Sequence, residues 1–346
     1  MKPLTRLAGW LVLAGLAAVI LVIAGGATWA YLALNRPHAA WDGPSIDVVI
    51  PSGMSARETF GRLAEAGVVG HPTLLARWLV LRGGGGAIQA GEYRFERSAS
   101  AVEVLARLER GDVLLHAITI PEGLDLIEIA ERLVHEEFGQ KEELLAVFRD
   151  PALILDRDGD ATDLEGYLFP ETYHFPRGAS AGTIARTMVE RFWQEAGEEF
   201  PGRAAEAGLT LREAVTLASM IERETSLPEE RGKISRVFHN RLDRRMRLQC
   251  DPTVIYALRR EGREVGRLTY RDLEFDSPWN TYVSYGLPPG PIASPGKASL
   301  DAAVLPEEGR ELYFVASPEG GHRFSATLDA HLEAVAVWRR YSRSSR

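Results

Sequence analysis

Two glutamates, Glu222 and Glu224, stand near the end of segment 211–225, whose apolar residues recur at helical spacing. Pro228 follows and predicts that the helix ends just before it. At 100° per residue, the two carboxyl groups lie about 160° apart, on opposite edges of the apolar stripe. They cannot easily face each other across a bond, as the paired carboxylates of an ordinary glycosidase do. Acid–base chemistry at this helix would therefore depend on one glutamate.

The alternative is that both glutamates only form ion pairs at the edge of the core. Three cations that follow in the sequence could serve as partners: Arg231, Lys233 and Arg236. Periodicity does not choose between Glu222 and Glu224, because both border the same stripe. From the helix alone, we favour the structural interpretation, in which both glutamates only form ion pairs.

The composition of the chain narrows the class of ligand. Its 346 residues include 40 lysines and arginines against 48 aspartates and glutamates, which gives a net charge of −8. Such a chain has no basic field to attract a nucleic-acid backbone, so a neutral or polar ligand fits better. The single cysteine, Cys250, cannot form an intrachain disulfide, and the eight histidines show no zinc-binding spacing. We therefore expect no metal site and no cofactor.

An internal repeat indicates where regular structure surrounds these residues. The run Val48–Gly53 is echoed seventy positions later by Ile118–Gly123, and each copy reads as a short β-branched strand that stops at Pro-x-Gly. A capping box follows each copy at the same offset: Ser55-x-x-Glu58 and Asp125-x-x-Glu128. The predicted helices are 56–66, 73–81, 101–109 and 126–134, with a strand at 92–95. Such βα units suit either a carbohydrate-binding module or a spacer, and both interpretations stay open.

The N-terminal segment predicts a membrane anchor. Residues 7–35 contain no charged side chain and exceed the roughly 20 residues that span the hydrocarbon core of a bilayer. A cleaved signal peptide is the alternative, but its apolar region usually runs only about 7–15 residues. Lys2 and Arg6 favour a cytoplasmic N-terminus by the positive-inside rule. The rest of the chain would then lie outside the cytoplasm.

Several long and irregular motifs occur from residue 165 onward. They are the stretches 165–173 (EGYLFPETY), 217–225 (LASMIERET), 236–242 (RVFHNRL), 246–256 (MRLQCDPTVIY), 277–282 (SPWNTY) and 286–296 (GLPPGPIASPG). Together they resemble the YceG-like family of endolytic murein transglycosylases, in the family's order, and the resemblance runs from about residue 44 to 340. Cys250 stands where threonine is expected in the family, and Trp279 where tyrosine is common.

The resemblance implies a mixed α/β (α+β) protein of the cell inner (cytoplasmic) membrane. Its expected parts are a cytoplasmic N-terminus (1–6), one transmembrane helix (7–35), a LysM-like βα subdomain (44–115) and a periplasmic catalytic domain (116–346). The implied activity is that of a lyase, a lytic transglycosylase that cleaves the bond between N-acetylmuramic acid (MurNAc) and N-acetylglucosamine (GlcNAc) in peptidoglycan and leaves 1,6-anhydro-MurNAc ends. Cleavage of nascent glycan strands would terminate their elongation. Penicillin-binding proteins or other cell-wall synthases are the implied protein partners.

The same resemblance assigns the acid–base role to Glu222, the first glutamate of the family motif Leu-Ala-Ser-x-x-Glu-x-Glu-Thr. One carboxyl group suffices, because it can protonate the leaving glycosidic oxygen and then accept the proton of the C6 hydroxyl as that oxygen closes on C1. Four polar residues are the expected sugar contacts, with loop scaffolding as the alternative for each: Gln249, Asp251, Asn280 and Tyr282. Two other functions stay open, a non-catalytic peptidoglycan-binding scaffold for synthases and a hydrolase that uses Glu222 with a second acid.

Overall fold

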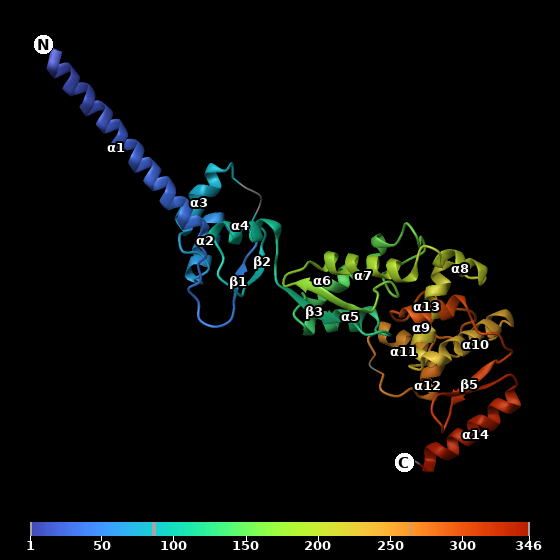
Figure 1. Cartoon of the computed structure of the whole chain (residues 1–346). Coiled ribbons are helices and arrows are strands. Elements are labelled where there is room, and N and C mark those ends of the chain that lie inside the picture. The colour runs from blue at the N-terminus through green and yellow to red at the C-terminus, as the bar shows by residue number, and fades with distance from the viewer. Residues whose placement is uncertain (1, 85–87, 264, 345–346) are drawn as a thin grey trace. The chain divides into compact units, whose positions relative to one another are not determined.

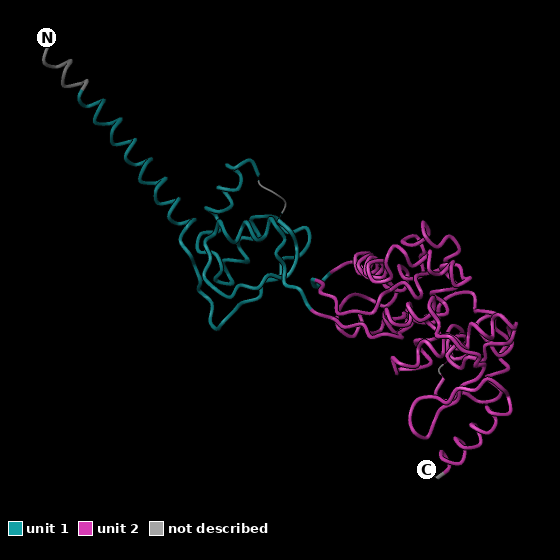
Figure 2. The backbone as a smooth tube through the Cα atoms, turned by 45° about the vertical axis from the view of Figure 1, so that its right-hand side comes forward, with its two compact units in different colours: residues 1–116, 176–178 teal, residues 117–175, 179–346 magenta. Residues whose placement is uncertain are grey.

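The computed structural model describes residues 2–84, 88–263 and 265–344, with side chains from residue 10 to residue 343. The chain divides into two compact units, residues 1–116 with 176–178 and residues 117–175 with 179–346 (Figure 2). Lys2 and Arg6, which favour a cytoplasmic N-terminus, lie outside the residues whose side chains are described.

The first unit begins with a long apolar helix, α1 (Lys2–Asn35) (Figure 1). Its stretch Trp10–Asn35 has a mean hydropathy of 2.4, and no residue of its most apolar window is buried inside the protein. A helix satisfies its backbone polar groups internally, so it can cross a bilayer without exposing them to lipid. The predicted helix over residues 7–35 is confirmed as an apolar helix of membrane-spanning length.

The rest of the first unit packs three helices against a two-stranded sheet. Strands β1 (Ile46–Ile50) and β2 (Gly91–Phe95) pair antiparallel, from Ile46 opposite Phe95 to Ile50 opposite Gly91. The helices are α2 (Ala56–Glu65), α3 (Pro72–Leu81) and α4 (Ala101–Arg110). They share a core that includes Val48, Phe60, Leu75, Tyr93 and Leu105. Burial of this apolar surface gives the first unit a hydrophobic core of its own.

The predicted capping boxes start the helices that follow the two repeat copies. Ser55 accepts the Glu58 N–H at 3.3 Å, and the Glu58 carboxylate accepts the Ser55 N–H at 2.9 Å. Asp125 and Glu128 form the same reciprocal pair at the start of α5 (Leu126–His135). Each box satisfies N–H groups that have no partner within the helix. Both predicted helix starts are confirmed.

The second unit is larger and mostly helical, with two separate two-stranded sheets. Strand β3 (Leu115–Thr119) pairs with β4 (Thr172–Pro176), while β5 (Tyr313–Ala316) and β6 (His322–Ser325) form a hairpin that packs against α14 (Leu328–Ser344). The other helices are α6 (Lys141–Phe148), α7 (Ala181–Ala196), α8 (Phe200–Glu206), α9 (Leu211–Glu224), α10 (Arg231–Asp243), α11 (Asp251–Arg260), α12 (Tyr270–Leu273) and α13 (Lys297–Val304). The predicted mixed α/β class is confirmed.

Helix α9 forms the centre of the second unit. Every residue from Ala214 to Ile221 is buried, and Thr210 caps the start of the helix. The helix packs against α8, α10, α11 and α13 (Figure 1). The helix predicted over 211–225 is confirmed, and it ends at Glu224 because Thr225 turns to an extended conformation. Since a helix buried on all sides has little room to move, the residues of its last turn are held rigidly.

Candidate active site

Glu222 lies in the last turn of α9, and two donors hold its carboxyl group. The Gly296 N–H donates to Oε2 at 3.0 Å, and Nη2 of Arg231 donates to Oε1 at 3.2 Å. Only 6% of the Glu222 side chain is exposed. The ion pair with Arg231 that the structural interpretation predicts is therefore present. The same carboxyl group also borders a cleft, so a ligand in the cleft can contact it in addition to Arg231.

An open cleft of about 450 Å³ lies over the end of α9 within the second unit. Three carboxyl groups line it, those of Glu122, Glu222 and Glu224. The other lining residues are Gly123, Arg223, Thr225, Ser226 and Arg231. All of these residues except Gly123 have polar side chains. A ligand in this cleft must therefore be recognised by hydrogen bonds and charge, which suits a chain rich in hydroxyl groups.

Two loops are joined beside the end of α9. The Gly123 N–H, in the turn that ends the second repeat copy, donates to the Ser294 carbonyl at 2.9 Å. The Ile292 N–H, in the same loop as Ser294, donates to Ser219 Oγ on α9 at 3.0 Å. These bonds connect the family motif 286–296 to both the repeat and the helix. The cleft thus unites segments that lie far apart in the sequence.

Glu122, in the Pro-x-Gly turn of the second repeat copy, is a site residue that the sequence analysis missed. Its carboxyl group lies 3.5 Å from Nη2 of Arg231, the same atom that lies 3.2 Å from the carboxyl group of Glu222. Burial raises the pKa of Glu122, and the neighbouring charge of Glu222 raises it further. The first repeat copy carries Ser52 at the same position. This difference between two otherwise similar copies is the signal that could have revealed Glu122.

Glu224 lines the same cleft and has a different partner. Burial raises the pKa of Glu224 to about 7, and the Cys250 thiol forms a hydrogen bond to its carboxyl group. The pKa of Cys250 is raised well above its usual value, first by burial and then by the charge of Glu224. The thiol therefore stays protonated and donates to the carboxylate. Cys250, at the position where threonine is expected, supplies the hydrogen-bond partner of a titratable cleft residue.

The four expected sugar contacts lie near one another but differ in exposure. Tyr282 donates its hydroxyl to Asp251 Oδ1 at 2.6 Å, while Asp251 and Gln249 are both exposed. Gln249 adopts a φ of 51°, which is uncommon for a residue with a side chain. Asn280 is fully buried, and its amide nitrogen donates to two backbone carbonyls at 3.0 and 2.8 Å. The scaffolding alternative is therefore the better account of Asn280.

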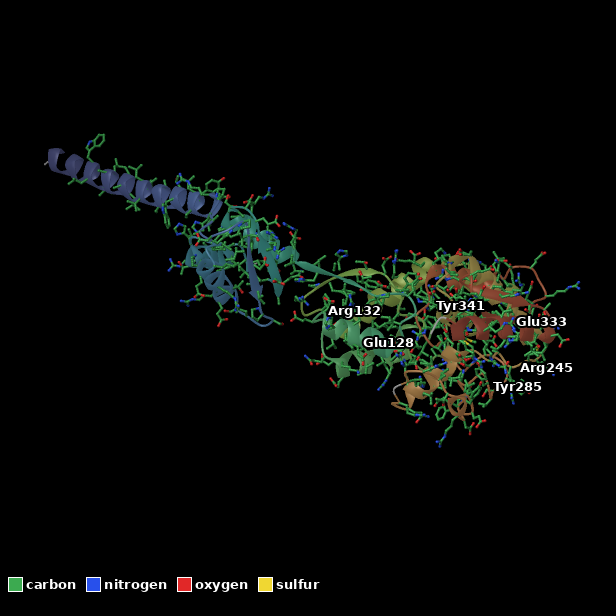
Figure 3. All side chains as sticks on the ribbon, turned by 90° about the horizontal axis from the view of Figure 1, so that it is seen from below. Glu128, Arg132, Arg245, Tyr285, Glu333 and Tyr341 are labelled. Atoms are coloured by element: carbon green, nitrogen blue, oxygen red, sulfur yellow. The ribbon has the colours of Figure 1, made fainter. Side chains whose placement is uncertain are left out.

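An exposed aromatic side chain that the sequence did not single out follows in the same loop. Tyr285 is 66% exposed (Figure 3), and the guanidinium carbon of Arg247 lies 4.8 Å from the centre of its ring. A flat ring with one polar end can pack against a sugar while its hydroxyl stays in water. Only the structure identifies Tyr285, because a tyrosine in the sequence gives no sign of its exposure.

Glu165 opens one of the family motifs but does not line the cleft. It is 2% exposed, its Oε1 accepts the Leu126 N–H at 3.2 Å, and its Oε2 accepts the Tyr256 hydroxyl at 3.1 Å. Burial raises the pKa of Glu165 well above its usual value, and the charge of Asp125 adds to the effect. Glu165 therefore connects the start of α5 to α11 and has a structural role.

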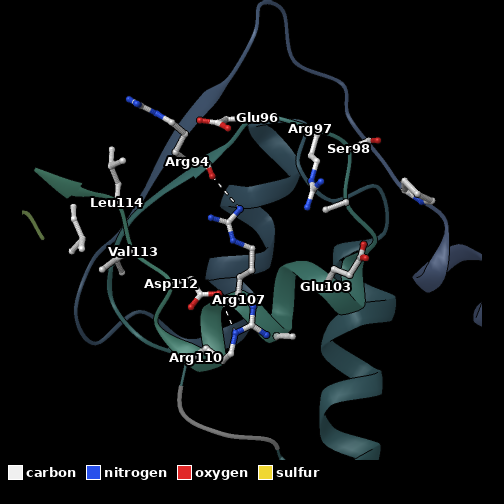
Figure 4. A pocket seen from close by; sticks show the side chains of 14 residues that line it. Arg94, Glu96, Arg97, Ser98, Glu103, Arg107, Arg110, Asp112, Val113 and Leu114 are labelled. Carbon is white, nitrogen blue, oxygen red and sulfur yellow. Dashed lines mark hydrogen bonds and ion pairs between the residues drawn. The ribbon is translucent and has the colours of Figure 1, made fainter.

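The first unit contains a separate groove of about 1050 Å³. Its charged lining residues are Arg94, Glu96, Arg97, Glu103, Arg107, Arg110 and Asp112 (Figure 4). Arg94 and Arg110 are each paired with an aspartate, at 2.7 and 2.6 Å. Arg107 lies over the Phe95 ring, 4.9 Å from its centre, and donates to the Arg94 carbonyl at 3.0 Å. The groove thus offers donors and acceptors of both charges to a polar ligand.

The titratable groups of the cleft can donate and accept protons. Among the residues that the structure describes, no group of three or more His, Cys, Asp or Glu side chains could hold a metal ion. The fold and the site define an α/β protein with an N-terminal apolar helix of membrane-spanning length and a cleft lined by carboxyl groups. The chain belongs to the YceG-like family, whose model matches residues 48–337.

Curated relatives and a solved structure agree with this membership. The endolytic murein transglycosylase of Bacillus subtilis (strain 168) is 32% identical over 329 residues, which cover 90% of each chain. The endolytic murein transglycosylase of Streptococcus pneumoniae serotype 2 (strain D39 / NCTC 7466) is 28% identical over 320 residues, which cover 84% of this chain and 58% of that protein. The crystal structure of a yceG-like protein from Listeria monocytogenes is similar with a TM-score of 0.58 and 32% identity, over 84% of this chain and 98% of that chain.

Proposed function

We propose that this protein is an endolytic murein transglycosylase. It cleaves the bond between MurNAc and GlcNAc in peptidoglycan glycan strands and leaves 1,6-anhydro-MurNAc ends. Membership of the YceG-like family and two relatives of that name support this proposal. The observation that carries it is the position of Glu222, whose carboxyl group ends a buried helix, is held by two donors and borders a polar cleft.

In this mechanism Glu222 acts first as an acid and then as a base. Its protonated carboxyl group gives a proton to the glycosidic oxygen, and the bond from C1 to that oxygen breaks. The resulting carboxylate accepts the proton of the C6 hydroxyl while that oxygen bonds to C1. The carboxyl group is protonated again at the end, so the cycle closes without a water molecule. The fixed position of the Glu222 oxygens suits both proton transfers.

The expected contacts to the glycan strand come from residues near Cys250 and Asp251, the neighbours of Glu224, and none of them lines the cleft itself. Gln249 and Asp251 are exposed and can reach a sugar, and Tyr282 holds the Asp251 carboxylate in place. Tyr285 adds an exposed ring. Asn280 contributes indirectly, because its buried amide fixes the turn that carries Tyr282. In this proposal the exposed residues bind the sugar, and the buried Asn280 holds the shape of the loop.

The apolar helix α1 anchors the protein in the cell inner (cytoplasmic) membrane as a single pass. Residues 1–6 lie in the cytoplasm and the catalytic domain, residues 116–346, in the periplasm, as the positive-inside rule favours. A tethered enzyme acts on strands close to the membrane, so nascent glycan strands are the proposed substrate and cleavage terminates their elongation. Penicillin-binding proteins or other synthases, which make such strands, are the proposed partners.

The globular part of the first unit, residues 44–115, is proposed to be a LysM-like module that binds glycan without cutting it. Its groove contains arginines and acids that can bind hydroxyl, amide and carboxylate groups. None of the three cleft carboxyl groups belongs to this unit. The module would hold a strand near the membrane, and cleavage would occur in the second unit.

Product chemistry tests the proposed function. The full chain, purified in detergent, is incubated with glycan strands in water enriched in ¹⁸O, and the products are resolved by mass spectrometry. We expect 1,6-anhydro ends, one water lighter than hydrolytic products and without ¹⁸O. Reducing ends that carry ¹⁸O would instead identify a hydrolase. Binding without cleavage would identify a non-catalytic scaffold, and either result would overturn the proposal.

A further inference from the structure

Three charged side chains from three segments meet at one point of the cleft. Arg231 Nη2 lies 3.2 Å from Glu222 Oε1 and 3.5 Å from Glu122 Oε2, and its Nε donates to Ser299 Oγ at 3.0 Å. The side chain of Arg231 is 9% exposed, while that of Glu122 is 50% exposed. One guanidinium, fixed by α13, is therefore shared by two neighbouring carboxyl groups that differ in access to solvent.

The contacts of Glu222 limit where its proton can come from. Its described neighbours include two hydrogen-bond donors, the Gly296 N–H and the Arg231 guanidinium, and the Glu122 carboxyl group, which shares Nη2 of Arg231 with it. A backbone amide and a guanidinium do not release protons near neutral pH. A carboxyl group does, and Glu122 reaches solvent. Among these neighbours only Glu122 can pass a proton to Glu222.

We propose that Glu122 is a positioning residue that shares one proton with Glu222 and thereby supplies the proton that Glu222 gives to the glycosidic oxygen. This inference rests on the proposed function and deepens it. The O–H of Glu122 donates its proton to a carboxylate oxygen of Glu222, so Glu122 becomes the carboxylate and Glu222 the acid. The pair has one negative charge before and after this transfer, and Arg231 balances that charge. No other reactant is needed.

The shared proton follows from repulsion between like charges. Two adjacent carboxyl groups cannot both ionise easily, so such a pair keeps one proton to a higher pH than a lone carboxyl group does. The raised pKa of Glu122, caused by burial and by the charge of Glu222, agrees with this arrangement. The raised pKa of Glu122 means that its carboxyl group keeps its proton to a higher pH than an ordinary glutamate does.

The other charged groups around the pair have partners of their own. On α9, Arg223 donates to the Gly123 carbonyl at 2.7 Å and pairs with Glu128 of α5 at 3.6 Å. The Glu224 carboxyl group has the Cys250 thiol as its hydrogen-bond partner. The loop 291–296 contains no titratable residue, and Lys297, which starts α13, donates to the Glu195 carbonyl and pairs with Asp301. The pKa of Glu122 is therefore set mainly by burial and by its neighbours Glu222 and Arg231.

The first test is the pH dependence of Glu122→Gln in the full chain. Glutamine keeps the size and hydrogen bonds of the side chain but carries neither charge nor an acidic proton. We expect the alkaline limb of the kcat–pH profile to shift to lower pH by about one unit or more. A coupling of about that size is what makes two groups titrate as a pair. Activity near pH 7.5 should fall about tenfold with little change in KM, and should approach the wild-type value at acidic pH.

A matched control is Glu206→Gln, the same chemical change at an exposed residue of α8. It should keep the wild-type pH profile. The inference is overturned if Glu122→Gln also keeps that profile, if only its KM changes, or if it is folded but inactive at every pH, since Glu122 would then itself be the acid. These outcomes presuppose an active wild-type protein, whereas absence of anhydro products from the wild type would contradict the proposed function instead.

A second variant tests the same contact without changing either glutamate. A Cβ added at Gly296 would overlap the Glu122 carboxyl group, and the φ of −76° at Gly296 suits alanine. The Gly296 N–H that binds Glu222 is retained. Gly296→Ala should therefore displace only the Glu122 carboxyl group and reproduce the lowered alkaline limb. A wild-type pH profile in folded Gly296→Ala would count against the inference, even if Glu122→Gln were too unstable to assay.

Discussion

At the scale of single residues, the proposed mechanism gives Glu222 two proton transfers that a glutamine cannot perform. Glu222→Gln keeps the shape of the side chain and can still accept from the Gly296 N–H. We expect its cleavage rate to fall by about 10²–10⁴-fold or more, the usual contribution of general acid–base catalysis. The thermal midpoint and retention on insoluble peptidoglycan should stay close to wild type. The rate is measured from the 1,6-anhydro products by mass spectrometry.

Glu224 provides the comparison on the same helix. Glu224→Gln should lose much less activity than Glu222→Gln, because Glu224 is bonded to Cys250 and is not a described partner of Arg231 or Gly296. If Glu224→Gln is the inactive variant while Glu222→Gln stays active, the assignment of the acid is wrong.

The raised pKa of Glu224 also predicts that the stability of the protein depends on pH. Burial raises its pKa to about 7 from an ordinary value of 4.5, so between these values the folded chain holds a proton that the unfolded chain has lost. The stability due to this proton is fully present below pH 4.5 and is lost as the pH rises through about 7. Glu224→Gln has no such charge to bury. We expect its thermal midpoint, relative to wild type, to be higher at pH 8 than at pH 5.

Circular dichroism melts at the two pH values measure this difference. Glu206→Gln is again the matched control, and its midpoint relative to wild type should not depend on pH. A Glu224→Gln midpoint that differs from wild type by the same amount at both pH values would show that the Glu224 proton is not linked to folding.

At the scale of elements, the cleft depends on close packing between a motif loop and helix α9. Gly166 has a φ of 82°, and a Cβ there would come within 2.5 Å of Pro291 and 2.9 Å of Val215 on α9. Gly166→Ala combines backbone strain with overlap in a packed core, each of which costs about 1–3 kcal/mol. We expect a loss of about 2 kcal/mol or more in the free energy of unfolding, measured by denaturant titration.

Gly208→Ala separates the two contributions. Gly208 has a similar φ of 76° but nothing lies within 4 Å of the position of its Cβ. It should therefore lose stability only through backbone strain. Equal losses in the two variants would mean that the contact between the Gly166 turn, Pro291 and α9 does not constrain the structure.

At the scale of the whole molecule, α1 predicts an uncleaved membrane anchor. Its stretch Trp10–Asn35 is 26 residues long, longer than the apolar region of a signal peptide. Full-length protein should stay in the membrane fraction after an alkaline carbonate wash and be released by detergent. A variant that lacks residues 7–35 should be released by the wash. A soluble mature form that starts near residue 31 would contradict the anchor.

The first unit predicts glycan binding without cleavage. Residues 34–116 contain the buried core of the first unit and the groove of Figure 4. This fragment should be retained on insoluble peptidoglycan, and Arg97→Glu, which reverses a charge that lines the groove, should weaken retention. Arg57→Glu, an exposed change outside the groove, is the matched control. Retention no greater than that of an unrelated acidic domain would leave only the spacer interpretation.

The sequence by itself determined the elements that depend on local physics. The apolar run of α1, the capping boxes at Ser55 and Asp125, and the periodicity of α9 each act over a few residues, so each was predicted and is confirmed as a helix or a helix start. The family motifs also placed the chain correctly in the YceG-like family. Local hydrogen bonding and burial on one face suffice for such predictions.

Only the tertiary structure decided which carboxyl groups meet. Glu122 and Glu222 are one hundred positions apart, and their contact depends on how the turn of the second repeat copy packs beside the end of α9. Helical periodicity placed Glu222 correctly on its helix but says nothing about groups that arrive from elsewhere. The same reason applies to Asn280, which is polar in the sequence but buried in the fold. Proximity and burial arise from packing of the whole chain, so no local pattern encodes them.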